Sequence, residues 1–306
     1  MIEVGSQLRL VAAWFANMCS WFVDKWFQRH DPIALRIFEG VFAATFLFYL
    51  TYQLPHWQFW LTDHGFRLTA ETLSTNYPHA APLLPAQWVW PVVITFVVFA
   101  LMFIVGIARN VLVWVMLLGA VYAQMVDQPS AFTINKVYVA MFFILAMGRL
   151  GVVFGDGPDD DGMTSAWPTR VIQASLLIMY LGAGVCKAAH GDWLSRPDIL
   201  WTHAQGPFRT AIAAWCVNVL PAPFWWVMAY GSLSFEVFAP VIFLWRKTRI
   251  YAILYGIVFH LSIAILMKDL IYFSVQMMTF YILFLSPAML HRWTDRWRKS
   301  SQAAQT

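Results

Sequence analysis

Long apolar runs recur along the whole chain, and no other feature restricts its fold as strongly. A helix needs about 20 residues to cross the hydrocarbon core of a membrane. Because a chain in lipid must satisfy its backbone hydrogen bonds internally, each such run predicts a helix. The sequence therefore predicts an all-α polytopic integral membrane protein of about eight transmembrane helices, at 33–54, 86–107, 110–127, 136–154, 171–188, 222–245, 250–267 and 270–287.

Composition supports this class of protein and excludes others. Of the 306 residues, 60% are hydrophobic and only 12% are charged, which is typical of membrane proteins. The net charge of +4 comes from loops and tails, and no basic stretch resembles a nucleic-acid-binding surface. The cysteines show no disulfide or zinc spacing, and no nucleotide-binding or metalloprotease motif occurs. We therefore expect membrane lipid around the chain, no nucleic-acid partner and no metal site.

The segment before the first span has an amphipathic pattern. Between residues 7 and 29, charged residues such as Lys25 alternate with aromatic ones such as Trp21. This pattern is typical of a helix that lies on the membrane surface. We therefore divide the chain into an interfacial amphipathic helix (1–30), one membrane domain (31–290) and a basic cytoplasmic tail (291–306).

Basic residues predict the orientation, because Lys and Arg concentrate on the cytoplasmic side of membrane proteins. With the N-terminus inside, 13 of the 20 Lys and Arg fall on the cytoplasmic side, six fall outside, and Arg36 lies within the first span. Both termini are then cytoplasmic, and Lys187 faces the extracytoplasmic side. The Asp-rich loop at 155–169 is expected to be solvated on the cytoplasmic side, with cation binding as the alternative.

Lys187 closes the apolar segment that begins at Val171. Desolvation beside hydrocarbon favours a neutral amine, which can act as a base near neutral pH. The alternative is a lysine that extends to the membrane interface and has no chemical role. Tyr180 is seven residues earlier and shares this helix face, either as a cofactor contact or as a packing residue.

Three further polar residues fall inside predicted spans. Glu236 and His260 are each about ten residues from the basic turn that joins their helices, so both lie roughly 14 Å from the cytoplasmic edge. They are predicted to form a charge pair, or else a hydrogen bond that fixes helix packing. Gln276 lies in the last span and is expected to point into the same cavity as His260, with Lys187 at its mouth.

Gly-Val-Cys-Lys at 184–187, followed by His-Gly-Asp-Trp at 190–193, resembles the signature of the vitamin K-dependent gamma-carboxylases and of their bacterial relatives, the horizontally transferred transmembrane (HTTM) domain proteins. The resemblance implies that Lys187 is the base that deprotonates a reduced quinone. It also aligns Asp192 and Trp193 with the family's acidic-Trp pair.

Other short motifs fit the same family in order, over roughly residues 30 to 290. They are Asp31 to Phe38 with Arg36 entering the first span, His64-Gly65-Phe66 in the first outer loop, Glu236 with Pro240, and His260 in the penultimate helix. Two positions depart from the family pattern. Cys186 stands where the vertebrate carboxylase has a second lysine, and Lys136 stands where a histidine is expected.

The resemblance implies a carboxylase-like enzyme of the bacterial inner membrane. Its cofactor is expected to be a reduced quinone of the vitamin K type, with O2 and CO2 as candidate co-substrates and a peptide or protein substrate outside. Lys187, His260 and Glu236 are the expected catalytic residues; Tyr180, Gln276, Asp192 and Trp193 are the expected quinone contacts. Two alternatives stay open: a non-catalytic membrane component of a peptide-maturation, export or immunity system, and a small-solute transporter with Glu236 and His260 as a proton relay.

Overall fold

The computed structural model describes residues 23–65, 82–126, 133–153 and 163–303, together with six residues between 13 and 21. The expected interfacial helix therefore lies partly outside the described residues, and those of its residues between 13 and 27 that are described are helical. Phe66 of the first outer loop and the four aspartates of the loop at 155–169 also lie outside the described residues.

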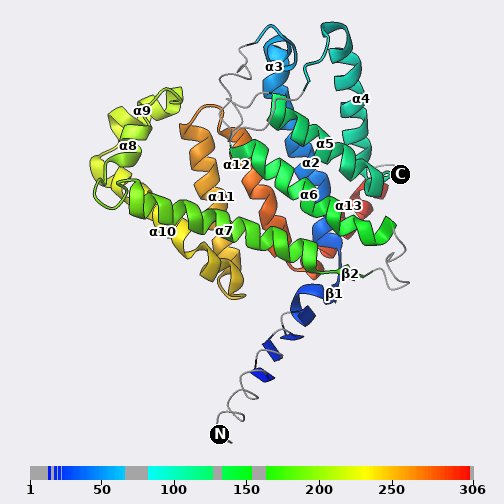
Figure 1. The fold of residues 1–306 in the computed structure, drawn as a ribbon. Coiled ribbons are helices and arrows are strands. Elements are labelled where there is room, and N and C mark those ends of the chain that lie inside the picture. Colours follow the sequence, from blue (N-terminus) through cyan, green and yellow to red (C-terminus); the bar gives the residue numbers. More distant parts are fainter. Residues whose placement is uncertain are drawn as a thin grey trace, which may run out of the picture.

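The described chain is almost entirely helical (Figure 1), which confirms the predicted all-α membrane class. Within the described residues, seven helices are long and apolar enough to cross a membrane. They are α2 (Ile33–Gln53), which continues through η1 (Leu54–His56) into α3 (Trp57–Leu61), then α4 (Ala86–Val105), α5 (Arg109–Val126), α6 (Thr133–Val153), α7 (Trp167–His190), α10 (Ala222–Leu244) and α11 (Arg249–Leu266).

The predicted span at 270–287 is shorter and broken. It forms α12 (Ile271–Thr279) and the 3₁₀ helix η2 (Phe280–Phe284), and the chain then bends by 108° into α13 (Pro287–Ala303). Leu285 is extended at the bend, and the next residue, Ser286, directly precedes Pro287, a position where a proline disfavours helical backbone. An eighth span exists only if this bent pair counts as one.

Aromatic side chains of α2 form the centre of the core. Phe38, Phe42 and Phe46 are spaced four residues apart and therefore share one helix face, and all three are buried. Phe42 lies 5.0 Å, between ring centroids, from Tyr138 of α6 and 5.8 Å from Phe280 of η2. The first span is thus packed inside the bundle.

The outward faces of the spans are apolar. On α7, Ile178, Leu181 and Val185 are exposed, and their spacing of three and four residues makes them one stripe. Tyr180 and Gly184 are buried on the opposite side of the same helix. A helix in lipid requires this arrangement, with an apolar stripe that faces outward and polar groups that face inward.

The ends of the bundle are closed by short elements. At one end, β1 (Arg29–His30) pairs antiparallel with β2 (Thr164–Ser165), and His291 of α13 bonds to Asp31. At the other end, α8 (Ile199–His203) packs on α10 and α9 (Ala211–Val219) packs on α11 (Figure 1). The segment that carries α8 and α9 lies beyond the end of α7 that holds Lys187.

Gly184 lets α7 and α10 approach each other closely. A methyl group at this position would lie 2.9 Å from the backbone nitrogen of Val237 and 3.1 Å from the carbonyl carbon of Glu236. Contacts of this kind between small residues and a neighbouring backbone are common in membrane helix pairs. The glycine places Lys187, one turn later on α7, against Glu236.

We predict that Gly184→Ala destabilises the protein by about 1–3 kcal/mol, because the added methyl group must push backbone apart. Gly182→Ala is the matched control, since it lies on the same helix and a methyl there meets nothing within 4 Å. The measurement is the free energy of unfolding in mixed micelles. Equal stability of the two variants would contradict a close helix contact at Gly184.

A second prediction concerns acid stability. The Asp31 carboxylate accepts hydrogen bonds from His291 Nε2 at 2.6 Å and from the N–H of Ile33 at 2.9 Å. Partial burial acts to raise the pKa of Asp31, but these hydrogen bonds outweigh it and the pKa is lowered. The stabilisation is therefore present above the unfolded-state value of about 3.9 and is lost as the pH falls through the folded-state pKa.

Asp31→Asn should lower the free energy of unfolding by at most about 1 kcal/mol at neutral pH, because the pair is solvent-screened. The stability of the variant should also be less sensitive to acid than that of the wild type. Unfolding free energies followed from neutral to acid pH measure this. Asp295→Asn on α13 is the control, since Asp295 is exposed and has no ion pair with the described residues. The same acid sensitivity in all three proteins would refute the assignment.

Candidate active site at the α7–α10 contact

Lys187 and Glu236 form an ion pair between α7 and α10. Lys187 Nζ lies 2.6 Å from Glu236 Oε1 and 2.8 Å from Oε2, so the ammonium donates to both carboxylate oxygens. The Glu236 side chain is 6% exposed, whereas that of Lys187 is 29% exposed. The carboxylate is therefore on the inner side of the pair and the amine on the accessible side.

Trp193 covers the Lys187 ammonium, with its ring centroid 4.7 Å from Nζ. The chain turns back after α7 because Asp192 has a left-handed backbone, with φ of +58°, a conformation that Asp tolerates better than most residues. Asp192 also accepts a backbone hydrogen bond from Arg196. Asp192 thus makes the turn, and Trp193 supplies a cation–π contact.

Tyr180 forms a buried chain of hydrogen bonds. Its hydroxyl lies 2.8 Å from His260 Nε2 on α11 and 2.6 Å from the hydroxyl of Tyr281 on η2. A methyl group at Gly256 of α11 would overlap the Tyr281 hydroxyl, so this glycine leaves room for the chain. His260 Nδ1 is buried without a hydrogen-bond partner among the described residues.

The predicted pair of Glu236 with His260 is wrong. Glu236 bonds to Lys187, and His260 bonds to Tyr180. The depth of a residue along its helix follows from counting, but the direction of its side chain depends on how the helix is rotated about its own axis. That rotation turns Glu236 toward α7, where an ammonium is a stronger partner for a carboxylate than an imidazole.

Gln276 does not join Lys187. Its side chain is buried, and Nε2 donates to the carbonyl of Ile134 in the first turn of α6 at 2.9 Å. The residue therefore links α12 to α6, as a polar side chain between membrane helices commonly does. Tyr180, by contrast, lies on the same face of α7 as Lys187, as its spacing predicted.

Tyr281 was not identified from the sequence. It lies in the apolar run of residues 280–285, where a tyrosine is an ordinary packing residue, and no spacing relates it to Tyr180. The one available signal was that a tyrosine hydroxyl in a membrane interior needs a hydrogen-bond partner.

The ion pair changes the chemistry expected of Lys187. A desolvated neutral amine was expected, but Lys187 instead donates to both oxygens of a carboxylate from the neighbouring helix. The pair as a whole is neutral and holds a carboxylate that can take up one proton. It can therefore act as a base as a unit, with Glu236 accepting the proton and Lys187 keeping its positive charge for an anion that forms beside it.

Comparison with protein-family models, with curated proteins and with solved structures finds no match for this chain. The family resemblance therefore rests on the short motifs alone.

Removal of either Lys187 or Glu236 should show how strongly their ion pair stabilises the protein. We predict that Lys187→Met destabilises the protein by up to about 3 kcal/mol, because it leaves a buried carboxylate without a cation. The double variant Lys187→Met/Glu236→Leu should recover most of that loss. Unfolding free energies of the wild type, both single variants and the double variant form a double-mutant cycle. Additive effects would show that the two side chains do not interact.

Proposed function

We propose that this chain is a membrane enzyme whose Lys187–Glu236 pair removes a proton from the hydroxyl of a reduced quinone, in the manner of the vitamin K-dependent gamma-carboxylases. One observation carries the proposal: the lysine of the family-like motif is held by a membrane carboxylate on one side and an indole ring on the other. The reaction takes place on the extracytoplasmic side of a bacterial inner membrane.

The residues around the pair suit a quinone. Ser232 lies one turn before Glu236 on α10 and therefore shares its face, and its hydroxyl is buried without a hydrogen-bond partner among the described residues. A quinone ring oxygen is a hydrogen-bond acceptor for the Ser232 hydroxyl, and buried polar groups require such partners.

The bound quinone supplies an acidic hydroxyl and, once deprotonated, the reducing power that reacts with oxygen. The protein moves one proton and stabilises one charge. Glu236 accepts the proton, which leaves the pair with a net positive charge, and the Lys187 ammonium then faces the negative oxygen left behind. The Trp193 ring covers one side of this ammonium and excludes water there, which strengthens the attraction.

The test is turnover by the purified protein in detergent, supplied with chemically reduced vitamin K-type quinone and oxygen. We predict that mass spectrometry detects quinone epoxide with the wild type. Lys187→Met and Glu236→Gln should lower its rate at least about a hundredfold, the range that a general base contributes. Glu236→Gln keeps the shape of the side chain and a hydrogen-bond acceptor for Lys187, so it separates loss of the base from loss of the fold.

Lys247→Met is the control, because Lys247 is an exposed lysine in the turn between α10 and α11, and its side chain makes no hydrogen bond or ion pair with the described residues. It should turn over quinone like the wild type. Absence of epoxide from folded wild-type protein, with several quinones, would overturn the proposal. That outcome would favour a non-catalytic role, in which Lys187→Met leaves the physiological function intact.

A further inference from the structure

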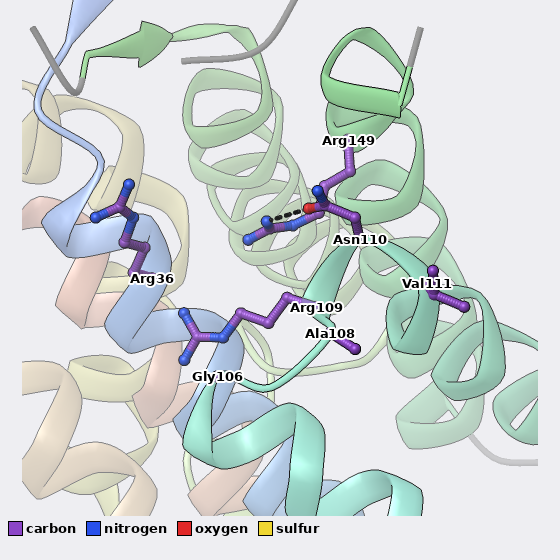
Figure 2. Close-up of a pocket in the computed structure, with 7 residues that line it drawn as sticks. All are labelled: Arg36, Gly106, Ala108, Arg109, Asn110, Val111 and Arg149. Atoms are coloured by element: carbon purple, nitrogen blue, oxygen red, sulfur yellow. Dashed lines mark hydrogen bonds between the residues drawn. The ribbon is translucent and has the colours of Figure 1, made fainter. Parts of the chain in front are cut away.

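A cavity of about 620 Å³ lies at the opposite end of the bundle from Lys187, between α2, α5, α6 and the turn after α4. Figure 2 shows three arginine side chains that line it from three different helices, Arg36 of α2, Arg109 of α5 and Arg149 of α6. The remaining lining includes the Asn110 amide. Three guanidinium groups around one hollow are an arrangement that recognises anions.

Among the residues that the structure describes, one carboxylate faces these arginines. Glu39 of α2 is buried and accepts hydrogen bonds from Arg149, whose Nη2 lies 2.6 Å from Oε1. Arg109 Nη1 lies 3.6 Å from Glu39 Oε2. With three guanidinium groups and one carboxylate, the cluster carries a net charge of +2.

Two of the arginines are held in place by other contacts. Arg149 Nη1 donates to Asn110 Oδ1 at 2.8 Å (Figure 2), and Arg109 donates to the carbonyls of Phe103 and Ile104 at the end of α4. Arg109 is also the first residue of α5, where the helix dipole adds positive potential. These groups are therefore preorganised and lose little entropy when an anion binds.

Arg36 is different from the other two. It is exposed, and its side chain makes no hydrogen bond or ion pair with the residues that the structure describes. Packing gives no reason for a guanidinium at this position, one turn into the first span. A ligand in the cavity would give Arg36 the partner that the protein does not supply.

We propose that this cavity binds a phosphate group that carries a net negative charge. A phosphate offers several acceptor oxygens, fits bidentate contacts with guanidinium groups, and offsets the surplus charge of the cluster. At the end of the bundle predicted to be cytoplasmic, two sources present this chemistry: the headgroup of an anionic phospholipid and a soluble phosphate. The proposal does not depend on the quinone chemistry at the opposite end of the bundle.

The test compares the wild type with Arg36→Gln and with Arg246→Gln, an exposed arginine in the turn between α10 and α11 that does not line the cavity. One arm titrates inorganic phosphate into the protein in a neutral detergent, by calorimetry and thermal shift. The other arm measures retention of phosphatidylglycerol against phosphatidylcholine by native mass spectrometry. Because the Arg36 side chain is exposed and makes no hydrogen bond or ion pair with the described residues, its variant should be as stable as the wild type without ligand.

Arg36→Gln should weaken binding about tenfold, the effect of one charge-assisted hydrogen bond, and Arg246→Gln should leave it unchanged. Binding in the phosphate arm alone identifies a soluble ligand, whereas selective retention of phosphatidylglycerol identifies a lipid. The proposal is overturned if the wild type binds in neither arm, or if Arg36→Gln binds like Arg246→Gln in both.

Discussion

A carboxylate inside a membrane must have a cation beside it, and the packing of this bundle depends on that requirement. Two buried glutamates, Glu39 on α2 and Glu236 on α10, each pair with basic groups from other helices. Glu39 ties α2 to α5 and α6, and Glu236 ties α10 to α7. Each pair fixes the rotation of its helices about their own axes. Apolar packing alone does not, because apolar side chains are similar on every lipid-facing side.

The two glutamate clusters differ in net charge. The two ends of the bundle are therefore suited to different chemistry. At Glu236 one ammonium meets one carboxylate, so the pair is neutral and can gain a proton. At Glu39 the carboxylate is outnumbered by guanidinium groups, so the cluster stays positive and attracts anions. One end is thus suited to proton transfer and the other to holding a charged group.

Hydropathy alone predicted the membrane class and the positions of seven spans in the described residues, because backbone desolvation permits few other structures in lipid. The break in the eighth predicted span, at 270–287, was not predicted. Spacing along one helix also predicted that Tyr180 shares a face with Lys187. Partners between helices could not be predicted, since a single sequence does not reveal how each helix is rotated. The cluster around Glu39 was missed for this reason, although a glutamate within the first apolar run was itself a signal.

The hydrogen-bond chain centred on Tyr180 and the ion pair of Lys187 with Glu236 both include residues of α7, so each depends on the position of the same helix. Tyr180 holds α7 to α11 and η2, while Gly184 and Lys187 hold it to α10. All three residues lie on the inward face, so a change in the rotation of α7 would break both sets of contacts together. Because buried hydrogen bonds in lipid have no water to replace them, the chain centred on Tyr180 makes such rotation costly. The position of the Lys187 ammonium over Glu236 therefore depends on groups two turns away in the core.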